Sequence, residues 1–162
     1  HLKNKKSGID PNIINSAIKF LHEPGISVMK ESKIAIKNKM ATSMHDPTEG
    51  GLITGLEEVA IASKNGMLID VNKIPIKTET AIICDKLNID PLGLISSGSL
   101  VITCNPNNTA NLIKLISDLK INVSKIGKIT EQNKGLKIIN DKTITDFPKF
   151  ERDEIARYFE SN

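Results

Sequence analysis

Apolar residues recur at helical spacing in three stretches at the start of the chain. The first, residues 10–25, begins with Asp-Pro, which favours a helix start, and ends with Pro-Gly, which stops a helix. In residues 27–39 lysines separate the apolar positions, as in a helix with one exposed face. Residues 52–66 carry the clearest apolar stripe and end in Asn-Gly. We therefore predict three helices in this part of the chain.

The rest of the chain alternates strand-like apolar runs with further helical stripes. Two helices are expected, one capped by Thr80 and one by Asn107 or Asn108, and a short last helix covers residues 153–159. A turn at Asn140-Asp141 predicts a hairpin. The predicted strands are residues 67–71, 99–104, 121–129, 136–139 and 143–147. This alternation predicts an α/β (α+β) fold with one mixed sheet that carries helices on its face or faces.

Composition places the chain among globular proteins and argues against a nucleic-acid partner. Its 162 residues suffice for one domain, with 39% hydrophobic and 25% charged residues and a net charge of +3. Only 3% of the residues are aromatic, and arginine is limited to Arg152 and Arg157. Because single-strand binders stack bases on aromatic rings and base readers favour arginine, we expect no nucleic-acid partner.

The cysteines and the hydropathy pattern point to a reducing, membrane-free location. Cys84 and Cys104 lie far apart in apolar runs, so we expect neither a disulfide nor a zinc site. No apolar stretch reaches the roughly 18 to 20 residues of a membrane span. We therefore expect a cytoplasmic protein that does not bind a membrane.

One segment departs from what a stable helix prefers. Residues 44–52, MHDPTEGGL, enter the clearest predicted helix through two adjacent glycines, which cost about 1 kcal/mol each relative to alanine. Glycines at a helix start let phosphate or carboxylate reach the amides and the positive end of the helix dipole. The alternative is that Gly50 or Gly51 only permits tight packing, with the acidic residues and the proline before them forming a cap. The pattern alone leaves both interpretations open.

The two interpretations predict opposite effects of Gly51→Ala. If Gly51 has right-handed helical geometry, alanine raises stability by about 0.4 to 1 kcal/mol and weakens anion binding. If Gly51 is needed for packing or for a positive φ, alanine lowers stability.

The motif resembles a family signature. MHDPTEGGL is similar to the Asp-x-Thr-x-Gly-Gly-Leu signature of the C-terminal domain of the aminoimidazole ribonucleotide (AIR) synthase superfamily. That superfamily includes thiamine-monophosphate kinase, selenophosphate synthetase, formylglycinamidine synthetase and the hydrogenase expression/formation protein HypE. The resemblance, nearest to HypE-like proteins, covers nearly the whole chain through LHEPGISVMKES (21–32), MLIDVNKIPI (67–76), LNIDPLGLISSGSLVIT (87–103) and IGKITE (126–131).

The resemblance implies a division of the molecule into two domains. It implies an α/β domain with a partly ferredoxin-like sheet, which in that family packs against an amino-terminal ATP-binding domain. That domain supplies most magnesium-binding carboxylates and the dimer interface. We therefore expect residues 1–162 to be one domain of a longer, homodimeric protein that binds ATP, Mg and a small-molecule substrate. The chain has no acidic cluster with metal-site spacing of its own, so we expect no metal site and no activity in this part alone.

The resemblance also indicates the site residues. The expected substrate-binding and phosphate-binding residues lie in two segments: Asp46, Thr48, Glu49, Gly50 and Gly51, and Ser96, Ser97, Gly98 and Ser99. Asp46 is either a helix cap or a pocket carboxylate, and Thr48 either caps the helix or donates to an anion. His45 is a possible acid or base, although the sequence supplies no partner to orient it, and a structural role is favoured.

Two departures from HypE bear on the reaction. HypE proteins end in Pro-Arg-Ile-Cys and usually read Asn-Glu-Gly before a strand, where this chain has Phe159-Glu160-Ser161-Asn162 and Ser96-Ser97-Gly98-Ser99. We therefore favour phosphotransfer or ATP-dependent dehydration or cyclisation over cyanide-ligand synthesis. The alternatives are a non-catalytic ligand-binding or scaffold module and a HypE-type maturation factor. The reading frame upstream of His1 distinguishes an enzyme from a module.

Overall fold

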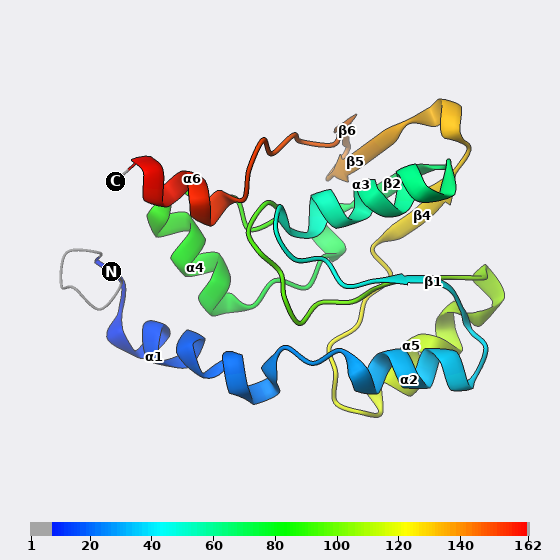
Figure 1. The fold of residues 1–162 in the computed structure, drawn as a ribbon, viewed down its shortest axis with the longest axis horizontal. Coiled ribbons are helices and arrows are strands. Elements are labelled where there is room, and N and C mark those ends of the chain that lie inside the picture. Colours follow the sequence, from blue (N-terminus) through cyan, green and yellow to red (C-terminus); the bar gives the residue numbers. More distant parts are fainter. Residues whose placement is uncertain (1–7, 162) are drawn as a thin grey trace.

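The computed structural model describes residues 8–161, and its first part contains the three predicted helices (Figure 1). α1 (Pro11–Lys19) starts where the carboxylate of Asp10 accepts a hydrogen bond from the amide of Asn12 at 2.8 Å. A π-helical turn (Leu21–Gly25) separates it from α2 (Met29–Lys37), and α3 (Gly51–Ser63) follows. Between α2 and α3 the chain forms a strand that the sequence did not predict, β1 (Ala41–His45).

The later elements follow the predicted alternation. They are β2 (Gly66–Asp70), α4 (Thr78–Leu87), β3 (Val101–Cys104), α5 (Thr109–Ser117), β4 (Gly127–Thr130), β5 (Leu136–Asn140), β6 (Thr143–Asp146) and α6 (Glu154–Ser161). Short 3-10 turns cover Val71–Lys73, Pro106–Asn108 and Gln132–Lys134. Asn108 stands at the predicted N-cap position of α5, although its side chain makes no capping bond, whereas Thr80 lies inside the first turn of α4 and does not cap it.

The strands form a mixed sheet of four and a separate ribbon of two. The sheet has the order β4-β2-β5-β6, with β2 and β5 parallel and the outer pairs antiparallel. β1 and β3 pair only with each other, antiparallel, with Met44 opposite Ile102. The mixed sheet of the predicted α/β fold is therefore present, but it does not include residues 99–104. β1 escaped prediction because ATSMH lacks the dense apolar or β-branched run that marks a strand.

The predicted strand at residues 121–129 is mostly wrong. Only its end forms β4, which starts at Gly127. Ile121 and Val123 instead pack against the core between α2 and α5. Their apolar character therefore comes from side-chain burial and not from a place in a ladder.

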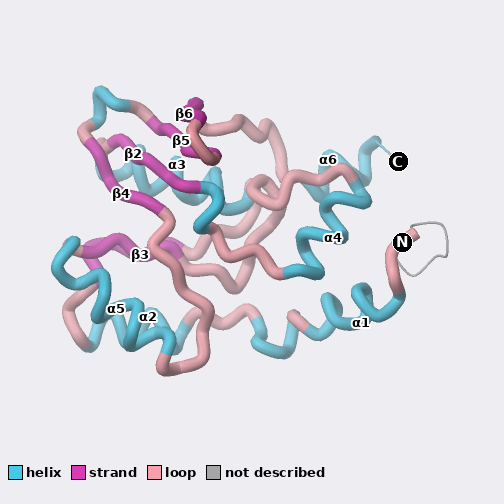
Figure 2. Tube along the Cα trace, turned by 180° about the vertical axis from the view of Figure 1, so that it is seen from behind, coloured by secondary structure: helices cyan, strands magenta, loops and turns pink. Residues whose placement is uncertain are grey.

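The elements stack in four layers with two cores (Figures 1 and 2). Leu56 and Ala60 of α3 pack with Met67 and Ile69 of β2, so α3 covers the four-stranded sheet. On its other side α3 contacts the end of β1, where Gly55 meets His45. The second core lies beyond the ribbon, between α2 and α5. The MHDPTEGGL segment begins at the end of β1 and therefore lies in the middle of the stack.

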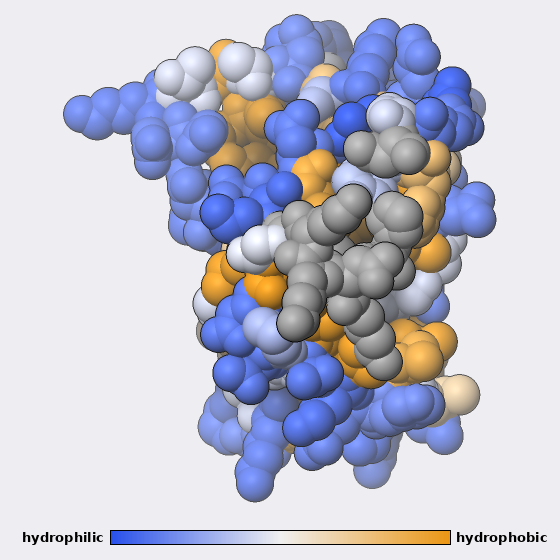
Figure 3. Space-filling model, turned by 90° about the vertical axis from the view of Figure 1, so that its left-hand side faces the viewer, coloured by the Kyte–Doolittle hydropathy of each residue, from blue (hydrophilic) through white to orange (hydrophobic). Residues whose placement is uncertain are grey.

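The two ends of the described chain lie at one end of the molecule, with α1, α4 and α6 (Figures 1 and 2). Ser16 of α1 donates to the carboxylate of Glu79 of α4 at 2.9 Å. Hydrophobic side chains reach the surface there among hydrophilic ones (Figure 3). Within residues 8–161, every helix is too short or too polar to cross a bilayer.

Candidate functional site

The turn between β1 and α3 needs both of its glycines for its backbone. Gly50 and Gly51 have φ of +77° and +70°, a left-handed conformation that strains any residue with a Cβ atom. A Cβ on Gly51 would lie 2.5 Å from the carbonyl oxygen of Leu92 and 2.7 Å from that of Leu94. The right-handed geometry that the first interpretation of Gly51 requires is therefore absent, and the packing requirement is present.

The amides of this turn already have acceptors within the chain. The Gly51 amide donates to the carbonyl of Thr48 at 3.1 Å, and the Ile53 amide donates to the carbonyl of Leu92 at 3.1 Å. The Gly50 amide donates to the carboxylate of Asp153 at 2.9 Å. A carboxylate of the C-terminal segment thus holds the place that the sequence suggested for an anionic ligand.

The polar side chains of the turn remain at the surface. Asp46, Thr48 and Glu49 are exposed, whereas Pro47 is fully buried. The side chains before Gly50 do not cap α3, so the capping box of the alternative interpretation is not formed. These three side chains therefore remain candidates for contact with a ligand.

The serine loop meets this turn through one residue. The Ser96 amide donates to the carbonyl of Thr48 at 3.3 Å, and its hydroxyl donates to the carbonyl of Pro47 at 3.2 Å. Ser97 and Ser99 are exposed. Gly98 is also exposed, but it packs against the α1–α2 connection, because a Cβ there would lie 3.0 Å from the Cα of Ile26. The structure therefore brings the two predicted segments together at Ser96 and leaves exposed hydroxyls beside the turn.

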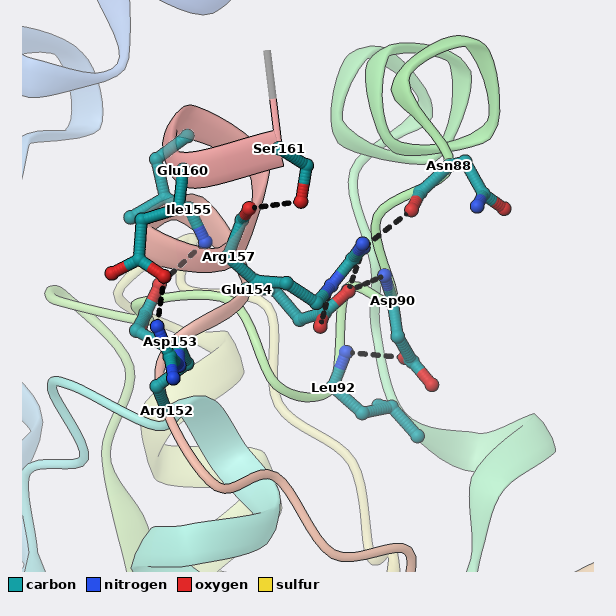
Figure 4. Close-up of polar contacts among 10 residues, drawn as sticks. All are labelled: Asn88, Asp90, Leu92, Arg152, Asp153, Glu154, Ile155, Arg157, Glu160 and Ser161. Atoms are coloured by element: carbon teal, nitrogen blue, oxygen red, sulfur yellow. Dashed lines mark hydrogen bonds and ion pairs between the residues drawn. The ribbon is translucent and has the colours of Figure 1, made fainter.

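The C-terminal segment anchors the loop at residues 88–93 (Figure 4). The buried carboxylate of Glu154 accepts hydrogen bonds from the Asp90 amide at 2.8 Å and from the Arg157 Nε at 2.6 Å. Arg157 also donates to the carbonyl of Asn88 at 2.6 Å. The bonds from Arg157 hold the pKa of Glu154 below its usual range, in spite of burial. The loop that carries Leu92 is thereby fixed to α6.

Two further contacts complete this anchor. The Glu154 amide donates to the carbonyl of Gly93 at 3.1 Å, and the ring of Phe150 lies where a Cβ of Gly93 would be. A cavity of about 380 Å³ at this anchor contains none of the predicted site residues in its lining, which is Lys149, Phe150, Glu151, Arg152, Glu154, Arg157 and Glu160. Arg152 pairs with Glu160 and Arg157 pairs with Glu154, so carboxylates of the same lining neutralise both arginines.

His45 has the partner that the sequence could not supply. Its Nε2 lies 2.8 Å from Oε2 of Glu58, and Glu58 lies about two turns into α3. The sequence also contained no sign that Asp153 lies next to the turn, or that Glu154 and Arg157 bond to the loop at residues 88–93. The only local signal for them was the acidic start of the last predicted helix, and Asp153 lies 103 residues from Gly50.

The cysteines and the acidic groups add no reactive centre among residues 8–161. Both cysteines are free thiols. Burial raises the pKa of Cys84 to about 11, which makes its thiolate a minor species at neutral pH. No three His, Cys, Asp or Glu side chains of the described residues are close enough to hold a metal ion. These residues alone do not fit a magnesium site.

Comparison with known proteins gives the same family as the motifs. The family AIR synthase related protein, C-terminal domain, matches residues 22–139. A Methanocaldococcus jannaschii protein named for hydrogenase expression/formation is 33% identical over 149 residues, which are 90% of this chain and 40% of that protein. Carbamoyl dehydratase HypE of Rhizobium leguminosarum is 38% identical over 73 residues, 45% of this chain and 21% of that protein.

Solved structures of HypE have the same fold. One of Escherichia coli HypE aligns with a TM-score of 0.67 and 25% identity, over 82% of this chain and 42% of that chain. A HypE structure in complex with ATP aligns with a TM-score of 0.64 and 20% identity, over 70% of this chain and 37% of that chain. The chain thus spans about two-fifths of the length of these relatives. Since the family match covers well over half of it, the chain belongs to the AIR synthase related protein family, as a C-terminal domain of that family.

Proposed function

We propose that this chain is the substrate-side and phosphate-side domain of an ATP-dependent enzyme of the AIR synthase and HypE type. The reaction is phosphotransfer or an ATP-dependent dehydration or cyclisation, completed by an amino-terminal domain. The family match over residues 22–139 carries the proposal. Structures of relatives bound to ATP, and of a ThiL protein bound to AMPPCP and TMP, support a nucleotide in the complete protein.

The exposed side chains of the two loops are the proposed ligand contacts. The hydroxyls of Thr48, Ser97 and Ser99 would donate to an anionic oxygen of the substrate, with Ser96 and Gly98 shaping the loop. Asp46 and Glu49 would face a donor or cationic group, because carboxylates repel an anion. Gly50 and Gly51 hold the turn, and the Gly50 amide becomes available only when Asp153 leaves it. The contribution of this domain is positioning and charge stabilisation.

Magnesium and most of the triphosphate contacts belong, in this proposal, to the amino-terminal domain. The described residues lack a metal-binding group of their own, so no step of the reaction is assigned to the ion here. We place the complete protein in the cytoplasm, as a homodimer acting on a small molecule, without membrane or nucleic-acid partners.

An exposed apolar surface is the proposed contact with the amino-terminal domain. Leu21, Ile26, Met29 and Ile36 are each more than half exposed. They follow one another along the π-helical turn and α2, which pass beside the serine loop at Gly98. A domain seated on this surface would cover the apolar side chains and close over the two loops.

Hydrogenase maturation is a second candidate, because one matched relative is named for hydrogenase expression/formation and a matched HypE structure is named a hydrogenase maturation protein. A HypE structure is also known in complex with HypF. Co-purification of the full-length protein with a HypF-like partner would favour this function. ATP turnover without such a partner favours the first proposal.

Calorimetry with Mg-ATP tests the division between the two domains. We expect weak binding to the 162-residue chain and micromolar binding to the full-length protein encoded by the same reading frame. A micromolar dissociation constant for the 162-residue chain, about −8 kcal/mol, would contradict the proposal. Failure of the full-length protein to bind would favour the non-catalytic module.

A further inference from the structure

β6 is an open edge of the four-stranded sheet. Within residues 8–161 it pairs only with β5, and it lies on the opposite side of the molecule from α2 and α5 (Figures 1 and 2). All four of its residues are exposed, with Ile144 at 59%. An edge strand presents unpaired N–H and C=O groups that another strand can use. We propose that two copies of this chain associate through antiparallel pairing of their β6 strands, which joins the two sheets into one.

The pairing with β5 decides which backbone groups of β6 point outward. The Phe147 amide donates to the carbonyl of Leu136 at 3.1 Å, so these two residues form a hydrogen-bonded pair. Hydrogen-bonded and non-bonded pairs alternate along an antiparallel ladder. Thr145 is therefore bonded to β5 as well, whereas the N–H and C=O groups of Ile144 and Asp146 point to the free edge.

The side chains of β6 alternate between the two faces of the sheet. Asp146 lies opposite Lys137 of β5, and the two side chains form an ion pair at 2.7 Å. Thr145 lies opposite Ile138, which packs against the core under α3. Because neighbours along a strand point to opposite faces, Ile144 and Asp146 lie on the face away from α3.

One antiparallel register suits both the backbone and the side chains. The outward groups of one strand must meet those of the other, so Ile144 pairs with Ile144 of the second copy. Asp146 then comes opposite Lys142, which precedes β6 in the turn, and the two-fold axis creates this pair twice. Thr143 meets Thr145 on the side of α3. A shift of two residues would place Ile144 opposite a charged residue instead.

The same register extends the contacts that β5 and β6 already make. Ile139 lies opposite Ile144, so the pairing would create a row of four isoleucines across the axis. Asp146 would lie between Lys137 of its own chain and Lys142 of the second copy. Apolar pairs and opposite charges that face each other across strands stabilise a sheet. The new edge thus adds to an existing pattern of side chains.

Charge on an edge strand usually prevents such pairing. The other edge of the sheet follows that rule, because β4 reads Gly-Lys-Ile-Thr and carries only a positive charge. β6 and its turn carry one charge of each sign, at positions 142 and 146, and an antiparallel two-fold turns these into two attractions. The contact includes none of the proposed site residues, so it is independent of the proposed reaction.

Sedimentation velocity of the 162-residue chain tests the association. Two short strands bury little area, so we expect a reversible dimer with a dissociation constant of about 10 µM to 1 mM. Ile144→Pro should abolish it and keep the monomer fold, because an edge strand accepts proline where the N–H points outward. Met29→Lys, on the exposed apolar surface of α2, should dimerise like the parent. A parent that stays monomeric at about 1 mM, or a dimer that Met29→Lys abolishes, would overturn the proposal.

Amide hydrogen exchange of the parent chain locates the contact. The Ile144 amide should exchange rapidly in dilute solution and become protected as the chain concentration rises. The Thr145 amide, which is bonded within the chain, should stay protected at every concentration. Dimerisation that leaves the Ile144 amide unprotected would place the contact elsewhere and overturn the proposal.

Charge reversal tests the register without relying on proline. Lys142→Glu and Asp146→Lys should each raise the dissociation constant about tenfold, because each places like charges opposite one another twice. An equimolar mixture of the two variants should associate as tightly as the parent, since every cross-strand pair then has one charge of each sign. Lys128→Glu on β4 is the matched control and should change nothing. A mixture that associates no more tightly than either variant alone would overturn the pairing.

Discussion

The turn at residues 46–51 and the loop at residues 96–99 differ in how they are held, although both carry the predicted site. The turn has a buried proline and a buried glycine, and its Gly50, Gly51 and Ile53 amides all bond within the chain. The loop is anchored mainly at Ser96, and its next three residues are exposed. One segment is therefore part of the framework, and the other is the part that can adapt to a ligand.

This difference shows what a glycine pair at a helix start can mean. From the sequence alone, the two glycines suggest that an anion has room to approach the start of the helix. In the structure its left-handed backbone and the carbonyls of Leu92 and Leu94 leave no such space at Gly51. The ligand-facing chemistry lies instead in the exposed side chains beside the glycines.

The largest effect is expected from Gly51→Ala. Alanine there adds left-handed strain and an overlap with two backbone carbonyls, so the free energy of unfolding should fall by about 2 to 5 kcal/mol. Gly25→Ala is the matched control, since Gly25 has φ +86° but nothing within 4 Å of its Cβ position. It should lose only the strain, about 1 to 2 kcal/mol. Urea unfolding of both variants checks this, and equal losses would break the comparison.

The anchor behind the turn should give the next largest effect. Glu154→Gln removes a charged acceptor from Arg157, so we expect a loss of about 1 to 3 kcal/mol at pH 7. Because the pKa of Glu154 is lowered in the folded state, its contribution is present above about pH 4.3 and fades as pH falls through the folded pKa.

Urea midpoints at pH 7 and in acid measure this dependence. Glu154→Gln should flatten the loss of stability on the acid side relative to the parent. Glu151→Gln, an exposed glutamate of the same segment, should behave like the parent. A Glu154→Gln curve parallel to the parent at every pH would show that the carboxylate does not anchor the loop.

The loop should tolerate change better than the turn. Gly98 has φ +93°, and a Cβ there would lie 3.0 Å from the Cα of Ile26 and 3.3 Å from the carbonyl oxygen of Gly25, so this backbone must move by a few tenths of an ångström. We expect Gly98→Ala to cost about 1 to 2 kcal/mol in thermal or urea unfolding. A loss as large as that of Gly51→Ala would mean that both segments are framework.

The smallest effect on stability is expected from Ser97→Ala. This side chain is exposed, so the free energy of unfolding should stay within about 0.5 kcal/mol of the parent. Phosphate or substrate affinity of the full-length protein should fall, because one donor is lost. Unchanged affinity would remove Ser97 from the proposed contacts.

The sequence predicted those parts whose signals are local. The helices α1 and α3 and the strands β2, β5 and β6 follow from apolar spacing and turn residues. β1 was missed because ATSMH has no dense apolar or β-branched run. Residues 121–123 were wrongly predicted as a strand, because Ile121 and Val123 are apolar for burial in the core and not for pairing in a sheet. The contacts of Asp153, Glu154 and Glu58 depend on tertiary placement, which no local pattern records.

Amide hydrogen exchange of the 162-residue chain tests most directly whether the turn is framework. The amides of Gly50, Gly51 and Ile53 should be protected, and that of exposed Ser97 should exchange rapidly. Asp153→Ala should release Gly50 while Ile53, bonded to Leu92, stays protected. Exchange at Gly50 and Ile53 as fast as at Ser97 would contradict the account and return the glycine turn to the role of an open anion site.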